Sequence, residues 1–231
     1  MQLFIQYLLY AHIAAGTCAL LTGPIAMVNQ NGNKLHRNAG KLFFYSMSFV
    51  FVSAVIISIA RSNTFLLIIA FFSYQLISVA MRSLHLKKLH LTQKPAVIDW
   101  VISIVSGLFS VGLVAFGVWG VVVMKNNFGF VALVFGFFSI QFLIADVKRF
   151  IKKPTDKNHW LYLHIGGMVG GYIATSTAFL VNVVHSDYPV VLWLSPVAIF
   201  YPFLVYTTRK FKNKFNKGKQ INEIATIKIN Q

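Results

Sequence analysis

The sequence predicts an all-α fold, an integral membrane bundle of seven helices. Of its 231 residues, 57% are hydrophobic and only 11% are charged, whereas soluble proteins carry about 25% charged residues. The apolar residues gather into stretches of the length that crosses a bilayer core, about 20 residues each. A disulfide scaffold is excluded because Cys18 is the only cysteine, and the abundance of apolar residues excludes a disordered chain.

Seven apolar stretches have the length that a membrane-spanning helix needs. In chain order they are 3–28, 41–60, 64–84, 98–124, 127–147, 160–184 and 189–208. The first lacks a basic leading segment and is longer than the core of a signal peptide, so we interpret it as a true span. Short connections join the stretches, which predicts a single transmembrane domain over 1–208. The polar, basic residues 209–231 are expected to form a solvated cytoplasmic tail.

The distribution of basic residues predicts the orientation. Nineteen of the 21 Lys and Arg residues fall in the first, third and fifth connections and in the tail, and only Arg61 and Lys125 fall on the other side. The positive-inside rule therefore places the N-terminus outside and the C-terminus inside a cell membrane. The same rule and attraction to anionic lipid headgroups account for the net charge of +16. We therefore expect the lipid bilayer as partner and no nucleic acid.

Ionisable side chains inside membrane spans are costly, and each is a candidate functional residue. Within the spans or at their ends, six ionisable side chains are expected at one depth near the cytoplasmic boundary: His36, Arg37, Arg82, His85, Asp146 and His164. His12 is expected nearer the outer leaflet, roughly 24 Å from the cytoplasmic end of its span at 1.5 Å per residue.

The sixth stretch combines a polar face with a row of small residues. At 100° per residue, one face carries His164, Met168, Gly171, Thr175 and Asn182. Small residues recur every four positions at Gly166, Gly170, Ala174 and Ala178. Rows of this kind let helix backbones approach closely. The sixth helix is therefore expected at the centre of the bundle.

Three interpretations of the cytoplasmic-side cluster stay open. In the structural one, Asp146 pairs with Arg82 or Arg37, because buried charges need partners. In the second, His164, His36 and His12 are candidate ligands of a non-covalent haem b, since histidine is a usual axial ligand. In the third, His36, Asp146 and His164 hold a single zinc ion, which histidine and carboxylate bind well.

Two groups of segments carry a resemblance to a known family. They are AHIAAG, LLTGPIAM and LHRNAGKLF in the first half, and Asp146, Trp160, His164, Met168 and YIATSTAFLV in the second. This pattern resembles a bacterial family of multi-pass membrane proteins of unknown function, over about residues 8–185. The resemblance implies a bacterial inner membrane but no activity. As site residues it favours His12, His36, Asp146 and His164 over His85, His90, His159 and His185.

The first functional hypothesis is a membrane redox protein that binds haem b or a quinone, because intramembrane histidines outnumber carboxylates. His164 and His185 are separated by about 31 Å of helix, which excludes a pair of haems stacked along this span. No CxxCH motif is present, so any haem is bound without covalent attachment.

Two alternatives belong to other classes. A metal-dependent hydrolase acting on lipid resembles the seven-span architecture of ceramidase-like and progestin-receptor-like enzymes. However, their HxxxH pair is absent, and His159 and His164 are about 140° apart on a helix. A proton-coupled carrier is suggested by Pro196 and Pro202 in the seventh span, and a structural membrane subunit also fits the composition.

Overall fold

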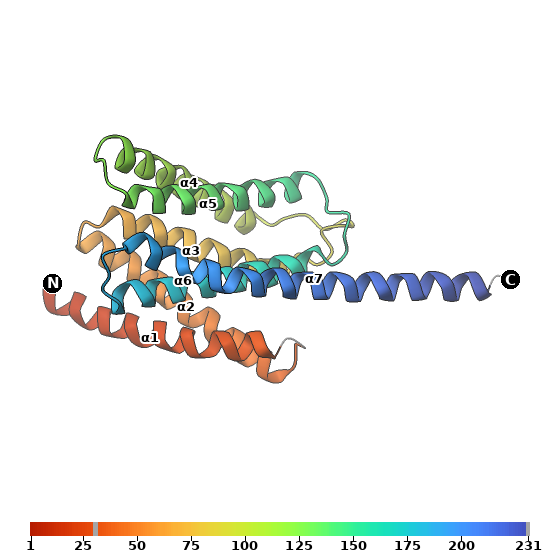
Figure 1. Ribbon diagram of the computed structural model, residues 1–231. Coiled ribbons are helices and arrows are strands. Elements are labelled where there is room, and N and C mark those ends of the chain that lie inside the picture. The colour runs from red at the N-terminus through yellow and green to blue at the C-terminus, as the bar shows by residue number, and fades with distance from the viewer. Residues whose placement is uncertain (30–31, 230–231) are drawn as a thin grey trace.

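The computed structural model describes residues 1–29 and 32–229, with side chains described up to residue 216. Over this part of the chain the fold is all-α (Figure 1), as predicted. Its seven helices are α1 (Gln2–Val28), α2 (Lys34–Ala60), α3 (Thr64–Ser83), α4 (Val97–Val122), α5 (Phe128–Ile151), α6 (His159–Val183) and α7 (Pro189–Ile229).

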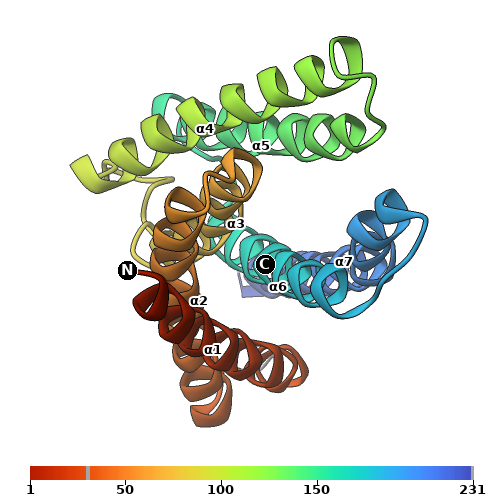
Figure 2. The same cartoon turned by 90° about the vertical axis from the view of Figure 1, so that its left-hand side faces the viewer.

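Six of the seven described helices are long and apolar enough to cross a membrane, and α6 is the exception. The chain is thus a multi-pass membrane protein. The sequence of α6 explains its lower hydropathy, because it contains two histidines and two Gly-Gly pairs. These weakly apolar residues are shielded from lipid, since α6 packs against α1, α3 and α7 (Figure 2).

Six of the described helices form two hairpins with a central pair between them, and α7 packs on α6. The α1–α2 hairpin and the α4–α5 hairpin lie on opposite sides of α3 and α6 (Figures 1 and 2). The close approach of α6 to α3 depends on Gly167 and Gly171, where an added Cβ would collide with Leu76 and Ile77. Of the predicted small-residue row, Gly170 also faces α3, since an added Cβ there would lie 3.3 Å from Leu76, whereas Gly166 faces open space.

Several helix ends differ from the predicted bounds, and two of them differ by seven residues or more. The second helix begins at Lys34 rather than residue 41, because the Asn33 side chain accepts a hydrogen bond from the His36 backbone N–H at 2.8 Å. This cap places His36 and Arg37 in the first helical turn. The seventh helix continues past residue 208 to Ile229 without a break at Pro196 or Pro202.

The end of the bundle that holds the α1–α2, α3–α4 and α5–α6 connections is here called the basic end, since most Lys and Arg residues lie there. The described part of α7 extends beyond this end (Figure 1). The predicted tail is helical at least to Ile229, so no change of secondary structure marks a boundary at 208. The tail's last basic side chains, Lys217, Lys219 and Lys228, and residues 230–231 lie outside the described part.

Candidate cofactor site

Two of the predicted site residues meet at the basic end of the bundle. His36 in the first turn of α2 and His164 in the second turn of α6 have ring centroids 6.3 Å apart, with their planes inclined at 68°. Both rings are partly buried. Residues that lie 128 positions apart in the sequence thus form one imidazole pair in the fold.

Each ring of this histidine pair lies close to a backbone carbonyl oxygen of another helix, α1 for His36 and α3 for His164. His36 Nδ1 lies 2.9 Å from the carbonyl oxygen of Ala26 near the end of α1. His164 Nδ1 lies 3.2 Å from the carbonyl oxygen of Ala80 on α3. A carbonyl oxygen can only accept, so Nδ1 of each neutral ring carries the proton and Nε2 keeps its lone pair. Neither Nε2 has a hydrogen-bond partner among the described residues.

The next turn of α2 leaves room beside the pair. Gly40 lies four residues after His36 and therefore on the same face of the helix. A Cβ added at Gly40 would meet no other atom within 4 Å. The absence of a side chain here keeps the space one turn above the His36 ring free.

Asp146 is not a member of the histidine pair. Its carboxylate lies 2.9 Å from Nε of Arg149, one turn away on the same helix, and both side chains are buried. The expected pairing of Asp146 with Arg82 or Arg37 is therefore wrong. It fails because a partner three residues away on the same helix needs no tertiary contact to be reached.

Arg82 and Arg37 have other partners. Arg82 makes a two-pronged contact with Asp99 of α4, at 2.7 Å from Nε to Oδ1 and 3.1 Å from Nη2 to Oδ2. Asp99 also accepts the backbone N–H of Ala96 at 2.8 Å, which secures the start of α4. Arg37 donates from Nη1 to the carbonyl oxygen of Gly32 at 2.8 Å and so closes the α1–α2 connection.

The three-ligand zinc set is not assembled in the described part of the chain. No group of three or more His, Cys, Asp or Glu side chains gathers closely enough there to hold a metal ion. A zinc site takes at least three protein ligands, and the histidine pair supplies two. The His36, Asp146 and His164 metal set therefore finds no support.

His12 belongs to a separate contact. Its Nδ1 lies 2.8 Å from the hydroxyl oxygen of Ser53, which itself contacts the Phe49 carbonyl oxygen at 2.7 Å. Ser53 is 17 residues beyond His36 on α2, roughly 26 Å along the helix. His12 thus joins α1 to α2 and does not reach the histidine pair.

A second histidine pair lies nearby, but one of its rings has no free nitrogen. The centroids of His90 and His159 are 5.9 Å apart. His159 Nδ1 lies 3.0 Å from the Asp156 carbonyl oxygen, and its Nε2 lies 3.1 Å from the Leu86 carbonyl oxygen. Both ring nitrogens of His159 thus face backbone carbonyl oxygens, and the ring ties the α3–α4 connection to α6.

Sequence reasoning missed one buried polar contact between three helices. Ser139 of α5 donates to Oε1 of Gln75 on α3 at 3.2 Å and also contacts the hydroxyl of Ser110 on α4. The only sequence signals were Gln75 and Ser139 on the polar faces of their spans. Single serines do not identify a partner helix, because serine can also bond to its own backbone, as Ser110 does.

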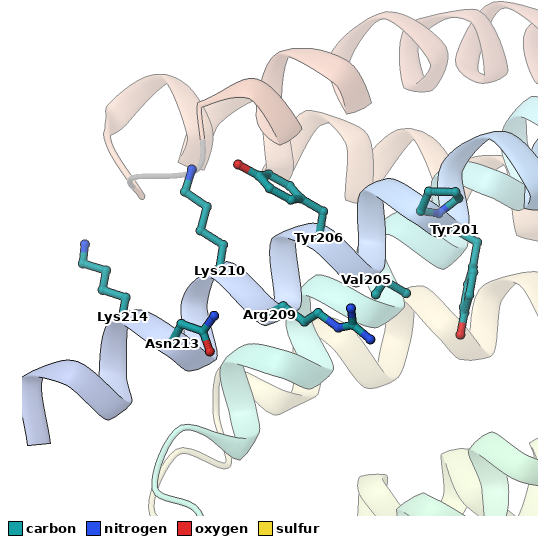
Figure 3. Close-up of a pocket in the computed structure, with 8 residues that line it drawn as sticks. Tyr201, Val205, Tyr206, Arg209, Lys210, Asn213 and Lys214 are labelled. Carbon is teal, nitrogen blue, oxygen red and sulfur yellow. The ribbon is translucent and has the colours of Figure 1, made fainter. Parts of the chain in front are cut away.

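A groove of about 900 Å³ runs along α7 at the basic end (Figure 3). Its lining residues all come from α7: Tyr201, Pro202, Val205, Tyr206, Arg209, Lys210, Asn213 and Lys214. In Figure 3 the side chains of Tyr206 and Lys210 point toward the end of the α1–α2 hairpin. The groove combines aromatic, apolar and basic side chains.

Comparisons with known proteins leave the chain without a family. No protein-family model, no curated protein and no solved structure matches it. The resemblance noted in the sequence therefore finds no support from these comparisons. The functional argument depends on the histidine pair and its surroundings.

Proposed function

We propose that the protein is a membrane redox protein that holds one haem b between His36 and His164. The observation that carries the proposal is the separation of 6.3 Å between the two ring centroids. The inferred lone pairs on both Nε2 atoms would let these two rings hold the iron of one haem.

The separation of the two ring centroids can be compared with the values expected for two ways of arranging imidazoles around one metal ion. A metal–imidazole bond of about 2.0–2.1 Å, plus roughly 1.2 Å from nitrogen to ring centroid, places two opposed imidazoles about 6.4 Å apart. The same bonds at a tetrahedral angle give about 5.3 Å. The observed 6.3 Å between the ring centroids is closer to the value for opposed ligands than to the tetrahedral value.

The surroundings of the pair support ligation in two further ways. A hydrogen bond from Nδ1–H to a carbonyl oxygen orients a ligating histidine and raises its basicity, and both rings lie within reach of such a bond. The open space beside Gly40 suits a flat ligand next to His36.

We infer that the haem lies near the inner surface of a bacterial membrane. The uneven distribution of Lys and Arg supports an N-terminus outside and a C-terminus inside. When bound, the haem would supply one-electron chemistry, and His36 and His164 would fix its position near the basic end. Electrons would then be exchanged with a partner on the inner side or with a lipid-soluble carrier.

The test is the visible absorption spectrum of detergent-purified protein from haem-supplemented cells, oxidised and then reduced with dithionite. We expect a Soret band that shifts on reduction, with about one haem per chain. His36→Ala and His164→Ala should each lose most of the haem. His185→Ala is the matched control, because His185 is exposed near the other end of the bundle and its loss should leave the spectrum unchanged.

Each alternative gives a different result. A colourless wild-type protein would overturn the haem proposal, and so would unchanged spectra in both histidine variants. About one zinc per chain in a colourless sample would favour the hydrolase. Protein without colour or metal would leave a carrier or a structural subunit. Elution volume in gel filtration must match the wild type, so that loss of haem is not loss of fold.

A further inference from the structure

The groove along α7 is built from two parallel rows of side chains. Residues four apart lie on one ridge of a helix, and the lining residues fall into two such ridges. The first ridge is Tyr201, Val205, Arg209 and Asn213. The second is Pro202, Tyr206, Lys210 and Lys214. At each level of the helix, one residue from each ridge lines the groove.

The groove changes from apolar to basic along its length. Its first half, 201–206, lies in the apolar part of α7, and Tyr201 and Tyr206 are 56% and 64% exposed. Tyrosine rings are typical of the membrane–water interface, where the ring contacts chains and the hydroxyl contacts headgroups. The second half begins at Arg209 and Lys210, where the helix leaves the apolar sequence.

The cations of the groove are not neutralised by protein carboxylates in the described part of the chain. The two ion pairs found there are Arg82 with Asp99 and Arg149 with Asp146. The sequence has no Asp or Glu between residues 188 and 222, so α7 itself offers no partner nearby. Lys212 differs from its neighbours, because its ammonium lies over the Tyr162 ring at 5.2 Å and outside the groove.

We propose that this groove binds one anionic phospholipid. Its phosphate lies at the level of Arg209 and Lys210 on α7, with Lys214 beside the headgroup, and an acyl chain follows Val205 and Tyr206 into the bilayer. The order of apolar and basic levels along α7 matches the order of chain and phosphate in a lipid. A soluble phosphate compound would leave the apolar half of the groove uncovered. The proposal does not depend on the haem.

The test is native mass spectrometry of the full-length, delipidated protein in detergent. Phosphatidylglycerol and phosphatidylcholine with identical acyl chains are titrated separately. We expect the wild type to bind phosphatidylglycerol at least tenfold more tightly. Arg209→Gln/Lys210→Gln should weaken its binding at least fivefold and remove most of the preference. Lys152→Gln/Lys153→Gln removes two exposed cations at the same end of the bundle and should change binding less than twofold.

Further measurements separate a lipid site from general attraction of anions. Glycerol phosphate, which has the headgroup charge without chains, should not compete at the concentrations used. Tyr206→Ser should weaken both lipids, because it removes apolar contact and leaves the cations. Equal affinity of the wild type for the two lipids would overturn the proposal. So would an equal loss in the control variant, or competition by glycerol phosphate.

Discussion

The buried pair of Asp146 and Arg149 has too few hydrogen bonds for its charge. The two groups lie 2.9 Å apart, yet Nε and Nη1 of Arg149 have no well-aligned hydrogen-bond partner among the described residues. Removing one partner of a buried ion pair leaves an uncompensated charge and is strongly destabilising. Asp146 therefore supplies the countercharge that Arg149 needs inside the bundle.

Asp146→Asn should therefore destabilise the protein by about 3–5 kcal/mol, because it leaves a buried guanidinium without its countercharge. Unfolding by SDS titration measures this free energy. Asp187→Asn, at an exposed carboxylate, should change stability by less than about 0.5 kcal/mol. The double variant Asp146→Asn/Arg149→Met should recover much of the loss, since it removes both charges. If it is no more stable than Asp146→Asn, the ion-pair explanation is wrong.

His12 gives a second prediction at the level of a single residue. Because its contact is with Ser53, roughly 26 Å along α2 from His36, His12→Ala should leave the proposed haem spectrum unchanged. Its effect should instead be a loss of about 1 kcal/mol of stability, the usual value of one hydrogen bond. A haem content that falls in His12→Ala as it does in His164→Ala would place His12 at the cofactor after all.

At the scale of elements, the contact between α3 and α6 positions the histidine pair. His164 reaches the Ala80 carbonyl oxygen because Gly167, three residues later on α6, lets the two backbones approach closely. A side chain at this position would collide with the backbone of Leu76. Backbone at a contact cannot move aside as a flexible side chain can.

Gly167→Leu should accordingly separate α6 from α3 and cost at least about 1–3 kcal/mol through overpacking. Haem content should fall with it, because His164 moves with the helix. Gly166→Leu adds the same atoms to the neighbouring position, where no atom lies within 4 Å of the added Cβ, and should be tolerated. Thermal unfolding and the haem spectrum of the two variants make the comparison. Equal losses in both would show that leucine itself, and not the contact, is responsible.

At the scale of the whole molecule, the inferred orientation predicts which connections are accessible from outside. In a Cys18→Ser background, Asp187→Cys between α6 and α7 should react with a membrane-impermeant maleimide on intact cells. Lys153→Cys between α5 and α6 should react only after permeabilisation. Both positions are exposed, so burial does not account for a difference. The opposite pattern would invert the topology.

Much of the fold follows from the sequence, because helix length and hydropathy are local properties. The expected spans at 64–84 and 160–184 agree with α3 and α6 to within one residue. The start of α2 was predicted seven residues late because Lys34, His36 and Arg37 are not apolar, although Asn33 is a recognisable cap. Hydropathy marks the membrane-embedded part of a helix and not its ends.

The candidate site was predictable only in part. The histidines could be chosen because ionisable residues in spans are rare, and a shared depth suggested that His36 and His164 meet. Which carboxylate joins which arginine depends on the rotation of each helix. The Arg82–Asp99 pair connects α3 to α4. No local sequence pattern distinguishes this pairing from one between Arg82 and Asp146. The carbonyl partners at Ala26 and Ala80 carry no sequence signal at all.

Because α7 is one continuous helix, it can transmit movement from one of its ends to the other. Its 41 residues make a rod of about 60 Å at 1.5 Å per residue, roughly twice the thickness of a bilayer core. About half of the rod therefore stands clear of the membrane, in line with the half that packs on α6. A change of about 10° in tilt at Pro196 or Pro202, which lie roughly 40–50 Å from the far end at 1.5 Å per residue, would move that end by about 7–9 Å. Small movements of α7 beside α6 would thus displace the end of α7 that lies some 30 Å from the membrane surface.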